Sequence, residues 1–380
     1  MTGPMVRHWL FAATLVGARC LGITLTPLTP LHAQTVAAAG VATDYGPAIA
    51  EAREIVRDLM ADQNIPGFSI AVGLEGDVIW SEGFGYANLE HRIPVTTLTK
   101  FRVGSVSKPI TAAAMGILMD AGRLDLDALI QEYVPSFPER RYAITVRQVA
   151  GHIAGIRHYQ GDENLSAQRY TTVLDGLEIF DDDPLLFEPG TEFSYSSYGW
   201  NLLSAVVEGA SGESFLEYMK DVVFEPLGLR HTLAGHTDSI IAHRTAFYQR
   251  SQGGRLVNAP FVDNSYKWAG GGFLSTPEDL VRFGSAHLEP GFLEAETLET
   301  FFTSLRLDDG EKTNYGVGWF IRPNERGERV VYHTGGSVGG TTVLYVNRDR
   351  GLVVAAVANI GGARMGPGLA ARIAELFRER

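Results

Sequence analysis

The chain has 380 residues, of which 45% are hydrophobic and 20% are charged, and its formal net charge at pH 7 is −12. A chain of this length and composition can bury a large core, as one big domain or as two interleaved ones. The acidic balance argues against nucleic acid or an anionic membrane surface as a partner, and it favours a soluble protein.

The first 33 residues have the features of a secretory signal peptide. Arg7 precedes an apolar run over residues 9–18, and a Pro-rich segment then ends at Leu31-His32-Ala33. We therefore expect cleavage near Ala33, a linker over residues 34–44, and a secreted or periplasmic location. No later run approaches the roughly 20 apolar residues that a membrane helix needs, so no integral membrane segment is expected after cleavage. Loss of Arg7 and Arg19 with the signal would change the net charge from −12 to −14.

Ordered structure is expected to begin with a helix over about residues 47–62. Two strand-like runs follow at residues 68–74 and 78–85, and they flank the turn Glu75-Gly76-Asp77. This arrangement predicts a β-hairpin near the start of the mature chain.

A Ser-x-x-Lys motif, Ser105-Val106-Ser107-Lys108, opens an apolar-periodic stretch over residues 110–121 that stops at Gly122. If a helix starts near Ser105, the side chain at i+3 lies on the same face, so the amine of Lys108 can reach the hydroxyl of Ser105. A serine needs such a base to become a nucleophile. The motif alone is weak, and its alternative interpretation is a capping serine beside a solvated lysine.

The segment Tyr195-Ser196-Ser197 follows the turn residues Pro189-Gly190 and precedes helical patterns over residues 202–209 and 215–223. Tyr195 is therefore expected at a junction between a loop and a helix. A phenol there can relay protons, provided that a nearby cation lowers its pKa from about 10.

The third motif is His333-Thr334-Gly335-Gly336, at the end of a strand-like run over residues 330–333. Further strand-like runs at residues 341–346 and 352–358 and a helix over about residues 369–378 complete the chain. Glycines in such a strand let a substrate backbone lie close against it. His333 is expected to titrate near neutrality, which predicts a change in rate or substrate affinity between pH 5 and 8.

These elements predict an α+β fold. One antiparallel sheet would be built from both chain ends, at about residues 45–104 and 300–380, and covered by the terminal helices. A mostly helical region, about residues 105–299, would be inserted between the two halves of the sheet.

The three motifs, in this order, resemble those of active-site-serine penicillin-recognising enzymes, which carry Ser-x-x-Lys, Tyr-x-Asn or Ser-x-Asn, and Lys-Thr-Gly or His-Thr-Gly. Further likeness, at stretches such as Gly270-Gly271-Gly272 and Tyr315-Gly316-Val317-Gly318-Trp319, covers nearly the whole mature chain. The chain resembles the beta-lactamase-related serine hydrolase family, the group of class C beta-lactamases and D-alanyl-D-alanine carboxypeptidases. Two details narrow the resemblance. They are the segment Gly155-Ile156-Arg157-His158-Tyr159 and the Tyr-Ser-Ser and His-Thr-Gly pairing, and both are similar to the branch that contains the mitochondrial serine beta-lactamase-like protein.

The resemblance implies a beta-lactamase/transpeptidase-like fold with its site in the cleft between the sheet and the helical region. It implies acyl transfer, in which Ser105, Lys108 and Tyr195 are catalytic and the backbone amides of Ser105 and Gly336 form the oxyanion hole. Four further residues would bind substrate: Ser197, His333, Thr334 and Gly335. Ser197 departs from the family pattern, because asparagine is usual there and a hydroxyl offers fewer hydrogen-bonding groups than an amide.

Other chemistries fit the sequence poorly. Gly335-Gly336-Ser337-Val338-Gly339 matches the nucleophile elbow of alpha/beta-hydrolases, but no histidine follows His333, as that fold would require. Cys20, the single cysteine, lies in the expected signal. His152 and His158 lack partners at a metal-ligand spacing and are interpreted as loop or capping residues, so neither a metal nor an organic cofactor is expected.

The sequence thus predicts an exported active-site-serine hydrolase for a small-molecule or peptide substrate, most consistent with a peptidase or esterase. Because the second motif lacks asparagine at Ser197 and the third lacks lysine at His333, a peptidase or esterase is expected ahead of a beta-lactamase. A D-alanyl-D-alanine carboxypeptidase or class C-like beta-lactamase stays an alternative. A non-catalytic binding or filament-forming scaffold on the same fold is the alternative from another class, and self-association into an oligomer or filament is left open.

Overall fold

The computed structural model describes residues 45–378, and the expected signal and linker at residues 1–44 lie outside them. Within residues 45–378 the chain forms a seven-stranded sheet in the order β3-β2-β1-β12-β11-β10-β9, and each neighbouring pair is antiparallel. Its strands come from both ends of the chain, because β1 pairs with β12, from Phe68 opposite Ala358 to Leu74 opposite Leu352. The predicted α+β fold is confirmed.

The strands of this sheet are β1 (Gly67–Leu74), β2 (Asp77–Asn88), β3 (Ile93–Pro94), β9 (Phe320–Ile321), β10 (Val330–Ser337), β11 (Gly340–Asn347) and β12 (Leu352–Ala358). A three-stranded sheet contains β4 (Phe101–Arg102), β8 (Phe273–Ser275) and β5 (Leu233–Ala234), and a hairpin contains β6 (Tyr248–Arg250) and β7 (Leu256–Asn258). The small three-stranded sheet, which the sequence did not predict, places β4 just before Ser105.

The α-helices are α1 (Gly46–Asp62), α2 (Ser107–Asp120), α3 (Ile130–Tyr133), α4 (Val146–Ala150), α5 (Ser197–Ser211), α6 (Phe215–Met219), α7 (Pro277–Ser285), α8 (Ala295–Phe301) and α9 (Pro367–Leu376). Short 3₁₀ or π turns, labelled η1 (Gly104–Val106), η2 (Glu163–Leu165), η3 (Leu177–Ile179), η4 (Lys220–Phe224), η5 (Ser265–Lys267) and η6 (Trp268–Gly272), lie between them. Helix α5 begins five residues before the predicted pattern because Ser196 caps it, its hydroxyl accepting from the amide of Gly199.

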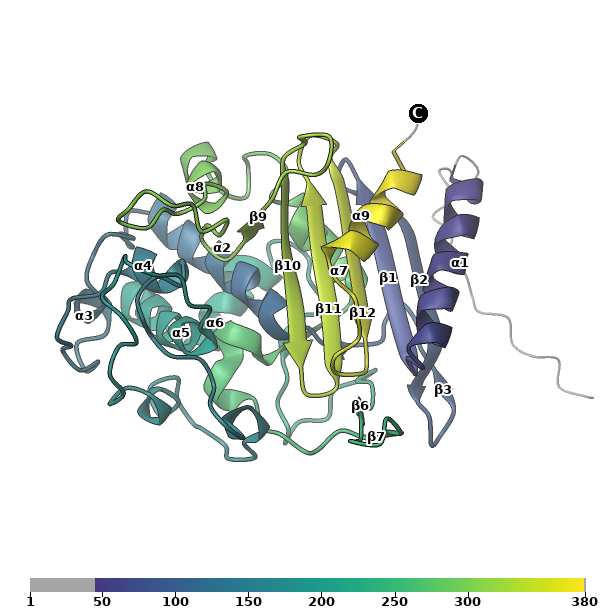
Figure 1. Ribbon diagram of the computed structural model, residues 1–380, viewed down its shortest axis with the longest axis horizontal. Helices are drawn as coiled ribbons and strands as arrows, with labels where there is room; N and C mark the ends of the chain where they lie inside the picture. Colours follow the sequence, from purple (N-terminus) through teal and green to yellow (C-terminus); the bar gives the residue numbers. More distant parts are fainter. Residues whose placement is uncertain (1–44, 379–380) are drawn as a thin grey trace, which may run out of the picture. The chain divides into compact units, whose positions relative to one another are not determined.

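The two faces of the sheet contribute to two hydrophobic cores. In β1, the side chains of Ile70 and Val72 join the core under the terminal helices α1 and α9, whereas Ala71 joins the core on the opposite face. This alternation is the period of two expected of a strand, and it buries the central strands on both faces. Figure 1 shows α1 and α9 in front of the strands and α7 behind them.

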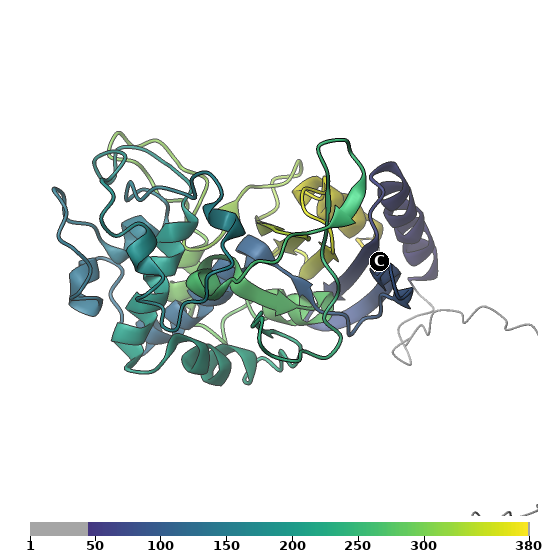
Figure 2. The same cartoon turned by 90° about the horizontal axis from the view of Figure 1, so that it is seen from below.

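The helical region adjoins the β10 and β9 edge of the sheet, as Figures 1 and 2 both show. Its centre is α5, which packs against α2, α3 and α4. Large side chains such as Trp200, Tyr198 and Phe215 are fully buried there. The core on the face of the sheet opposite α1 and α9 therefore continues from the sheet into the helical region. It fixes the position of α2 relative to β10.

Candidate active site

Ser105 lies in the turn η1, directly before α2, and Lys108 lies in the first turn of that helix. The spacing of three residues brings the Nζ atom of Lys108 to 3.0 Å from the Oγ atom of Ser105. Ser105 is partly exposed whereas Lys108 is fully buried. The hydroxyl can therefore meet a substrate while the amine stays shielded from water.

Lys108 has polar neighbours but no carboxylate among its contacts. Its amine contacts the hydroxyl of Ser197 at 3.1 Å and donates to the carbonyl oxygen of Gly270 at 2.8 Å, in addition to the contact with Ser105. Burial lowers the pKa of Lys108 well below its usual value, and the positive charge of Lys267 lowers it further. These conditions favour a neutral amine, which is the form that can take a proton from a serine.

Tyr195 lies beside the pair of Ser105 and Lys108. The Nζ atom of Lys108 lies 4.9 Å from the centre of its ring, and its hydroxyl is close enough to the side chain of Ser105 for that side chain to affect its pKa. Burial raises the pKa of Tyr195 above its usual value, so the lowered pKa that the sequence suggested is not found. The phenol is protonated at neutral pH and suits a proton donor.

His152 and His158 both contact the start of α5. The Nδ1 atom of His152 accepts from the amide of Ser196 at 3.0 Å, and that of His158 accepts from the amide of Ser197 at 3.1 Å. These two amides belong to a helix N-terminus, where backbone donors lack partners within the helix. The interpretation of both histidines as capping residues is confirmed.

The end of β10 offers a free backbone edge next to Ser105. Strand β9 pairs only with Val331 and Tyr332, and the carbonyl of Val330 accepts from Arg322 on that side. Because backbone groups alternate along a strand, the amides of the even-numbered residues, including Gly336, point toward this edge rather than toward β11. The amide of Gly336 is thus directed as an oxyanion donor would have to be.

His333 is buried, with only 1% of its surface exposed. Its Nδ1 atom lies 2.7 Å from the carbonyl oxygen of Thr334, so that nitrogen must carry the hydrogen, and its Nε2 atom accepts from the hydroxyl of Tyr315 at 3.1 Å. Mainly through burial, the pKa of His333 is lowered to about 3. This corrects the expectation that His333 titrates near neutrality, and both of its nitrogens are already engaged.

The remaining residues of the third motif lie along the same strand. A Cβ atom on Gly335 would lie 1.9 Å from the carbonyl oxygen of Val103, so only glycine lets β10 approach the segment before Ser105. Thr334 and Gly336 are at least partly exposed at the edge. Ser337 ends β10 and leads into the hairpin to β11, not into a helix, which agrees with the rejection of a nucleophile elbow.

Three residues that the sequence analysis did not single out individually as site residues contact this site. Gly270 accepts a hydrogen bond from Lys108. The hydroxyl of Tyr159 is close enough to the side chains of Ser197 and Tyr266 for both to affect its pKa. Lys267 is buried beside the rings of Tyr159 and Tyr266, and its burial, together with the charge of Arg102, lowers its pKa to about 7. The glycine run at residues 270–272 and the segment at residues 155–159 had been noted in the sequence, whereas Lys267 had given no signal.

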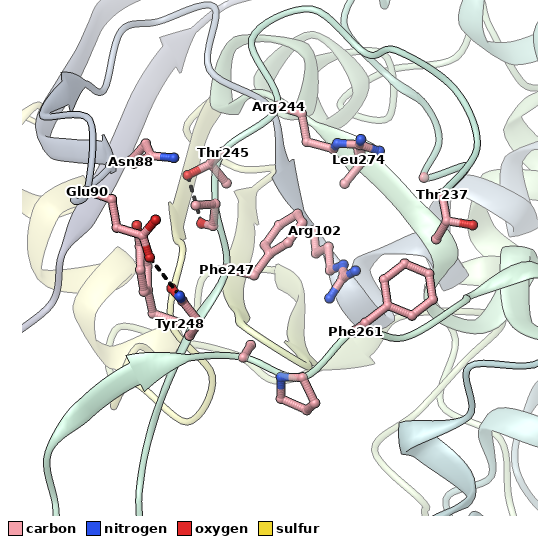
Figure 3. A pocket seen from close by; sticks show the side chains of 15 residues that line it. Asn88, Glu90, Arg102, Thr237, Arg244, Thr245, Phe247, Tyr248, Phe261 and Leu274 are labelled. Carbon is pink, nitrogen blue, oxygen red and sulfur yellow. Dashed lines mark hydrogen bonds between the residues drawn. The ribbon is translucent and has the colours of Figure 1, made fainter.

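A pocket of about 400 Å³ lies beyond the end of β10 and includes Arg102, three residues before Ser105. Arg102 is buried, its guanidinium lies 4.0 Å from the centre of the Phe247 ring, and its Nη1 atom donates to the carbonyl of Val338. Figure 3 shows Arg102 between the rings of Phe247 and Phe261. Through the contact of Arg102 with Val338, the pocket adjoins the turn that joins β10 to β11.

Two classes of feature are absent from the part of the chain that the structure describes. No group of three or more His, Cys, Asp or Glu side chains within residues 45–378 is placed to hold a metal ion. None of the helices described there has the length and apolar character needed to cross a membrane.

A serine and a buried lysine at the start of a helix, set against the edge of an antiparallel sheet, define a serine hydrolase of the beta-lactamase/transpeptidase fold. The family model described as Beta-lactamase matches residues 52–377, and the chain belongs to this family. Its relatives include the human mitochondrial serine beta-lactamase-like protein LACTB, which is 31% identical over 80% of this chain and 72% of its own length.

Solved structures agree with this fold. An octameric penicillin-binding protein homologue from Pyrococcus abyssi is 28% identical, with a TM-score of 0.73 over 86% of this chain and 75% of its own. A D-stereospecific amidohydrolase from Streptomyces sp. is 23% identical, with a TM-score of 0.72 over 86% of this chain and 98% of its own, a likeness that establishes the fold alone.

Proposed function

We propose that this protein is an exported serine hydrolase that forms an acyl-enzyme on Ser105 and acts as a peptidase or esterase. The observation that carries the proposal is the contact of 3.0 Å between the hydroxyl of Ser105 and the buried amine of Lys108. An amine in this setting is neutral, so it accepts the serine proton without first losing one of its own.

In the proposed acylation, Ser105 gives its proton to Lys108 as its oxygen attacks an amide or ester carbonyl. The backbone amides of Ser105 and Gly336 donate to the oxyanion that forms, a contribution worth about 3 kcal/mol for each donor. Tyr195 then donates its proton to the leaving group and recovers one from Lys108. Water releases the acyl group and returns its proton through Lys108 to Ser105, so every group regains its starting state.

The substrate is proposed to lie extended along the free edge of β10. Thr334 and Gly336 carry backbone groups on that edge, and Gly335 lets the strand and the nucleophile segment approach closely. A substrate long enough to pass Gly336 would reach the pocket at Arg102. Such an extended site favours a peptide or a peptide-like ester. His333, with both nitrogens engaged, is assigned to positioning the strand rather than to direct contact with a substrate carboxylate.

The test is the intact mass of the protein after reaction with a fluorophosphonate and, separately, with a penicillin. Wild type should gain one fluorophosphonate adduct, Ser105→Ala should gain none, and Ser337→Ala should still be labelled as the matched control. A penicillin adduct would favour the carboxypeptidase or beta-lactamase alternative. Absence of both adducts on a folded wild type would contradict the proposal and favour a non-catalytic scaffold.

Export is proposed on the features of residues 1–33. Determination of the N-terminal residue of the protein purified from its native cells tests it, with Gln34 expected after cleavage at Ala33. An intact Met1 would contradict export through a cleaved signal. Self-association is also proposed, since the homologue from Pyrococcus abyssi is described as octameric, and light scattering of the purified protein measures it.

A further inference from the structure

The pocket at Arg102 contains two arginines and lies next to the proposed site. Arg102 belongs to β4, three residues before Ser105, and only 9% of its surface is exposed. Its Nη1 atom donates to the carbonyl of Val338, in the turn between β10 and β11. Arg244 also lines the pocket, but it is exposed, and its Nη1 atom donates to the carbonyl of His236. The pocket therefore presents one buried and one accessible cation.

The described part of the chain supplies no carboxylate partner to either guanidinium. Neither Arg102 nor Arg244 forms an ion pair within residues 45–378. A guanidinium has five N–H donors, and one hydrogen bond to a carbonyl satisfies only one of them. Burial of a charge is costly unless the charge is paired. Arg102 is thus placed to bind an anion that does not come from these residues.

The acidic side chains Asp263 and Glu90 lie near this pocket, but each already has a hydrogen-bond partner. Asp263, whose charge acts on Arg102, accepts from the hydroxyl of Thr237. Glu90 lines the pocket and accepts from the side chain of Asn258 at 2.8 Å. Figure 3 shows Glu90 on the side of the pocket away from Arg102. The donors of Arg102 that face the pocket are therefore left for a ligand.

The proposed proton donor shows which part of a substrate would face the pocket. The ring centre of Tyr195 lies 6.3 Å from those of Phe320 and His333, so Tyr195 lies toward the start of β10. The leaving group must lie near Tyr195, because it takes its proton from there. The pocket lies in the other direction, at the turn that follows Gly336. The acyl part of the substrate therefore extends toward Arg102.

We propose that Arg102 and Arg244 form a subsite that binds a carboxylate carried by the acyl part of the substrate. The inference deepens the proposed function of Ser105 and rests on it. A guanidinium binds a carboxylate through parallel hydrogen bonds, which add geometric specificity to the attraction of charges. The rings of Phe247 and Phe261 flank Arg102 and would contact the chain that carries the carboxylate (Figure 3). The substrate class is thus a peptide or ester with an acidic acyl part.

The charge of the whole chain does not account for such a preference. The formal net charge is −12 at pH 7, and a protein with this charge repels anions at long range. A preference for an anionic substrate must therefore come from local cations. Substitution of the arginines in the pocket should remove it.

The experiment compares p-nitrophenyl half-esters of glutaric, adipic and suberic acid with the same compounds in which the free carboxylate is methylated. The two members of a pair differ in one negative charge, and the three lengths vary the reach of the acyl chain. For a chain that reaches Arg102, wild type should favour the acid over its methyl ester by about tenfold in kcat/KM, through charge-assisted hydrogen bonds. The difference should lie in KM, because a carboxylate remote from the reacting bond binds equally in the ground and transition states.

Arg102→Met should abolish this preference, and Arg244→Met should reduce it by about threefold, because an exposed cation contributes less than a buried one. The matched control is Arg250→Met. Arg250 is also exposed and also donates to a backbone carbonyl, that of Gln63, but it does not line the pocket. Its substitution removes the same charge and should leave the preference unchanged. Circular dichroism identifies a variant that fails to fold, and if Arg102→Met fails, Arg244→Met carries the test.

The outcomes are distinguishable. Equal kcat/KM for acid and methyl ester at every length in wild type would overturn the subsite and leave the proposed function intact. Retention of the full preference in the folded arginine variants of the pocket would do the same. A preference that is lost in Arg102→Met, or reduced in Arg244→Met, and retained in Arg250→Met supports the subsite. Absence of fluorophosphonate labelling at Ser105, with no turnover of either ester, would overturn the proposed function and the subsite together.

Discussion

The α-carbon of Gly104 lies against the peptide group of Gly336. A Cβ atom on Gly104 would lie only 2.5 Å from the carbonyl oxygen and 3.0 Å from the amide nitrogen of Gly336. This contact joins the segment that carries Ser105 directly to β10, and it fixes the distance between the two amides that are proposed to hold the oxyanion.

Gly104→Ala is therefore expected to lower kcat by about a hundredfold, since loss of one oxyanion donor costs about 3 kcal/mol. Gly122→Ala is the matched control, because Gly122 also has a positive φ, of 65° against 52° for Gly104, but no atom lies within 4 Å of its Cβ position. Gly122→Ala should lose about 1 kcal/mol of stability through backbone strain, and Gly104→Ala should lose more, because its Cβ atom also clashes with the backbone of Gly336. Steady-state kinetics and urea unfolding measure the two effects, and equal kinetic losses would refute the role of the contact.

The charge of Lys267 should shift the lower pH limit of activity, which is the pH at which Lys108 becomes protonated. Its positive charge disfavours protonation of Lys108, so Lys267→Met raises the pKa of Lys108. The acidic limb of the profile of kcat/KM against pH should move to higher pH, because the neutral base is then reached only at higher pH. Lys267→Arg retains the charge and should not move the limb upward. An unmoved limb in Lys267→Met would show that the charge of Lys267 has no influence on the base.

His333 should remain neutral between pH 5 and 8, since its pKa is lowered to about 3. Nitrogen NMR of the ring should show hydrogen on Nδ1 throughout this range, and protonation within it would contradict the buried arrangement. The unfolded state binds a proton near pH 6.5 and the folded state does not, so the free energy of unfolding falls as pH drops from about 6.5 toward 3. His333→Gln should weaken this dependence.

Arg157 should matter for stability. It is buried and paired with two carboxylates, so Arg157→Leu should cost about 3 kcal/mol in the free energy of unfolding. Arg147→Leu is the control, because its pair with Asp127 is largely exposed and should contribute less than about 1 kcal/mol. Denaturation in urea at neutral pH compares them, and similar costs would contradict the distinction.

The same pairing predicts an acid limit on stability. Burial acts to raise the pKa of Glu163, but its hydrogen bonds with Arg157, Gln160 and Tyr198 lower the pKa overall. A carboxyl whose pKa is lowered on folding stabilises the protein above its unfolded pKa of about 4.5, and that contribution is lost as pH falls through the folded value. Unfolding measured from pH 6 to 3 should show this loss in wild type and less of it in Arg157→Leu.

Helix α7, which packs against the face of the sheet opposite α1 and α9, was not predicted, although the sequence contains the pattern of a helix start. Thr276-Pro277 and the acidic pair Glu278 and Asp279 have the pattern of a helix start, and Thr276 does cap α7 by accepting from the amide of Asp279. The short strands β4, β5 and β8 had no such signal. Runs of two or three residues are too short for periodicity, and tertiary pairing alone makes them strands.

The sequence by itself determined the long strands of the main sheet, the terminal helices, and the spacing of Ser105 and Lys108. Apolar alternation and helical period depend on neighbouring residues, and the separation of three residues in the first turn of a helix fixes which side chains meet. The runs at residues 68–74 and 352–358 likewise predicted the strands that form the centre of the sheet.

Only the tertiary structure decided the charge of the base and the hydrogen-bond partners in the active site. The tautomer of His333, the contact of Gly104 with Gly336, and the contact of Lys108 with Ser197 each depend on how the chain packs in three dimensions. The physical reason is that burial and hydrogen-bond direction depend on every group packed around a side chain. A lysine in a short motif is therefore a base or a solvated cation according to neighbours that its local sequence does not specify.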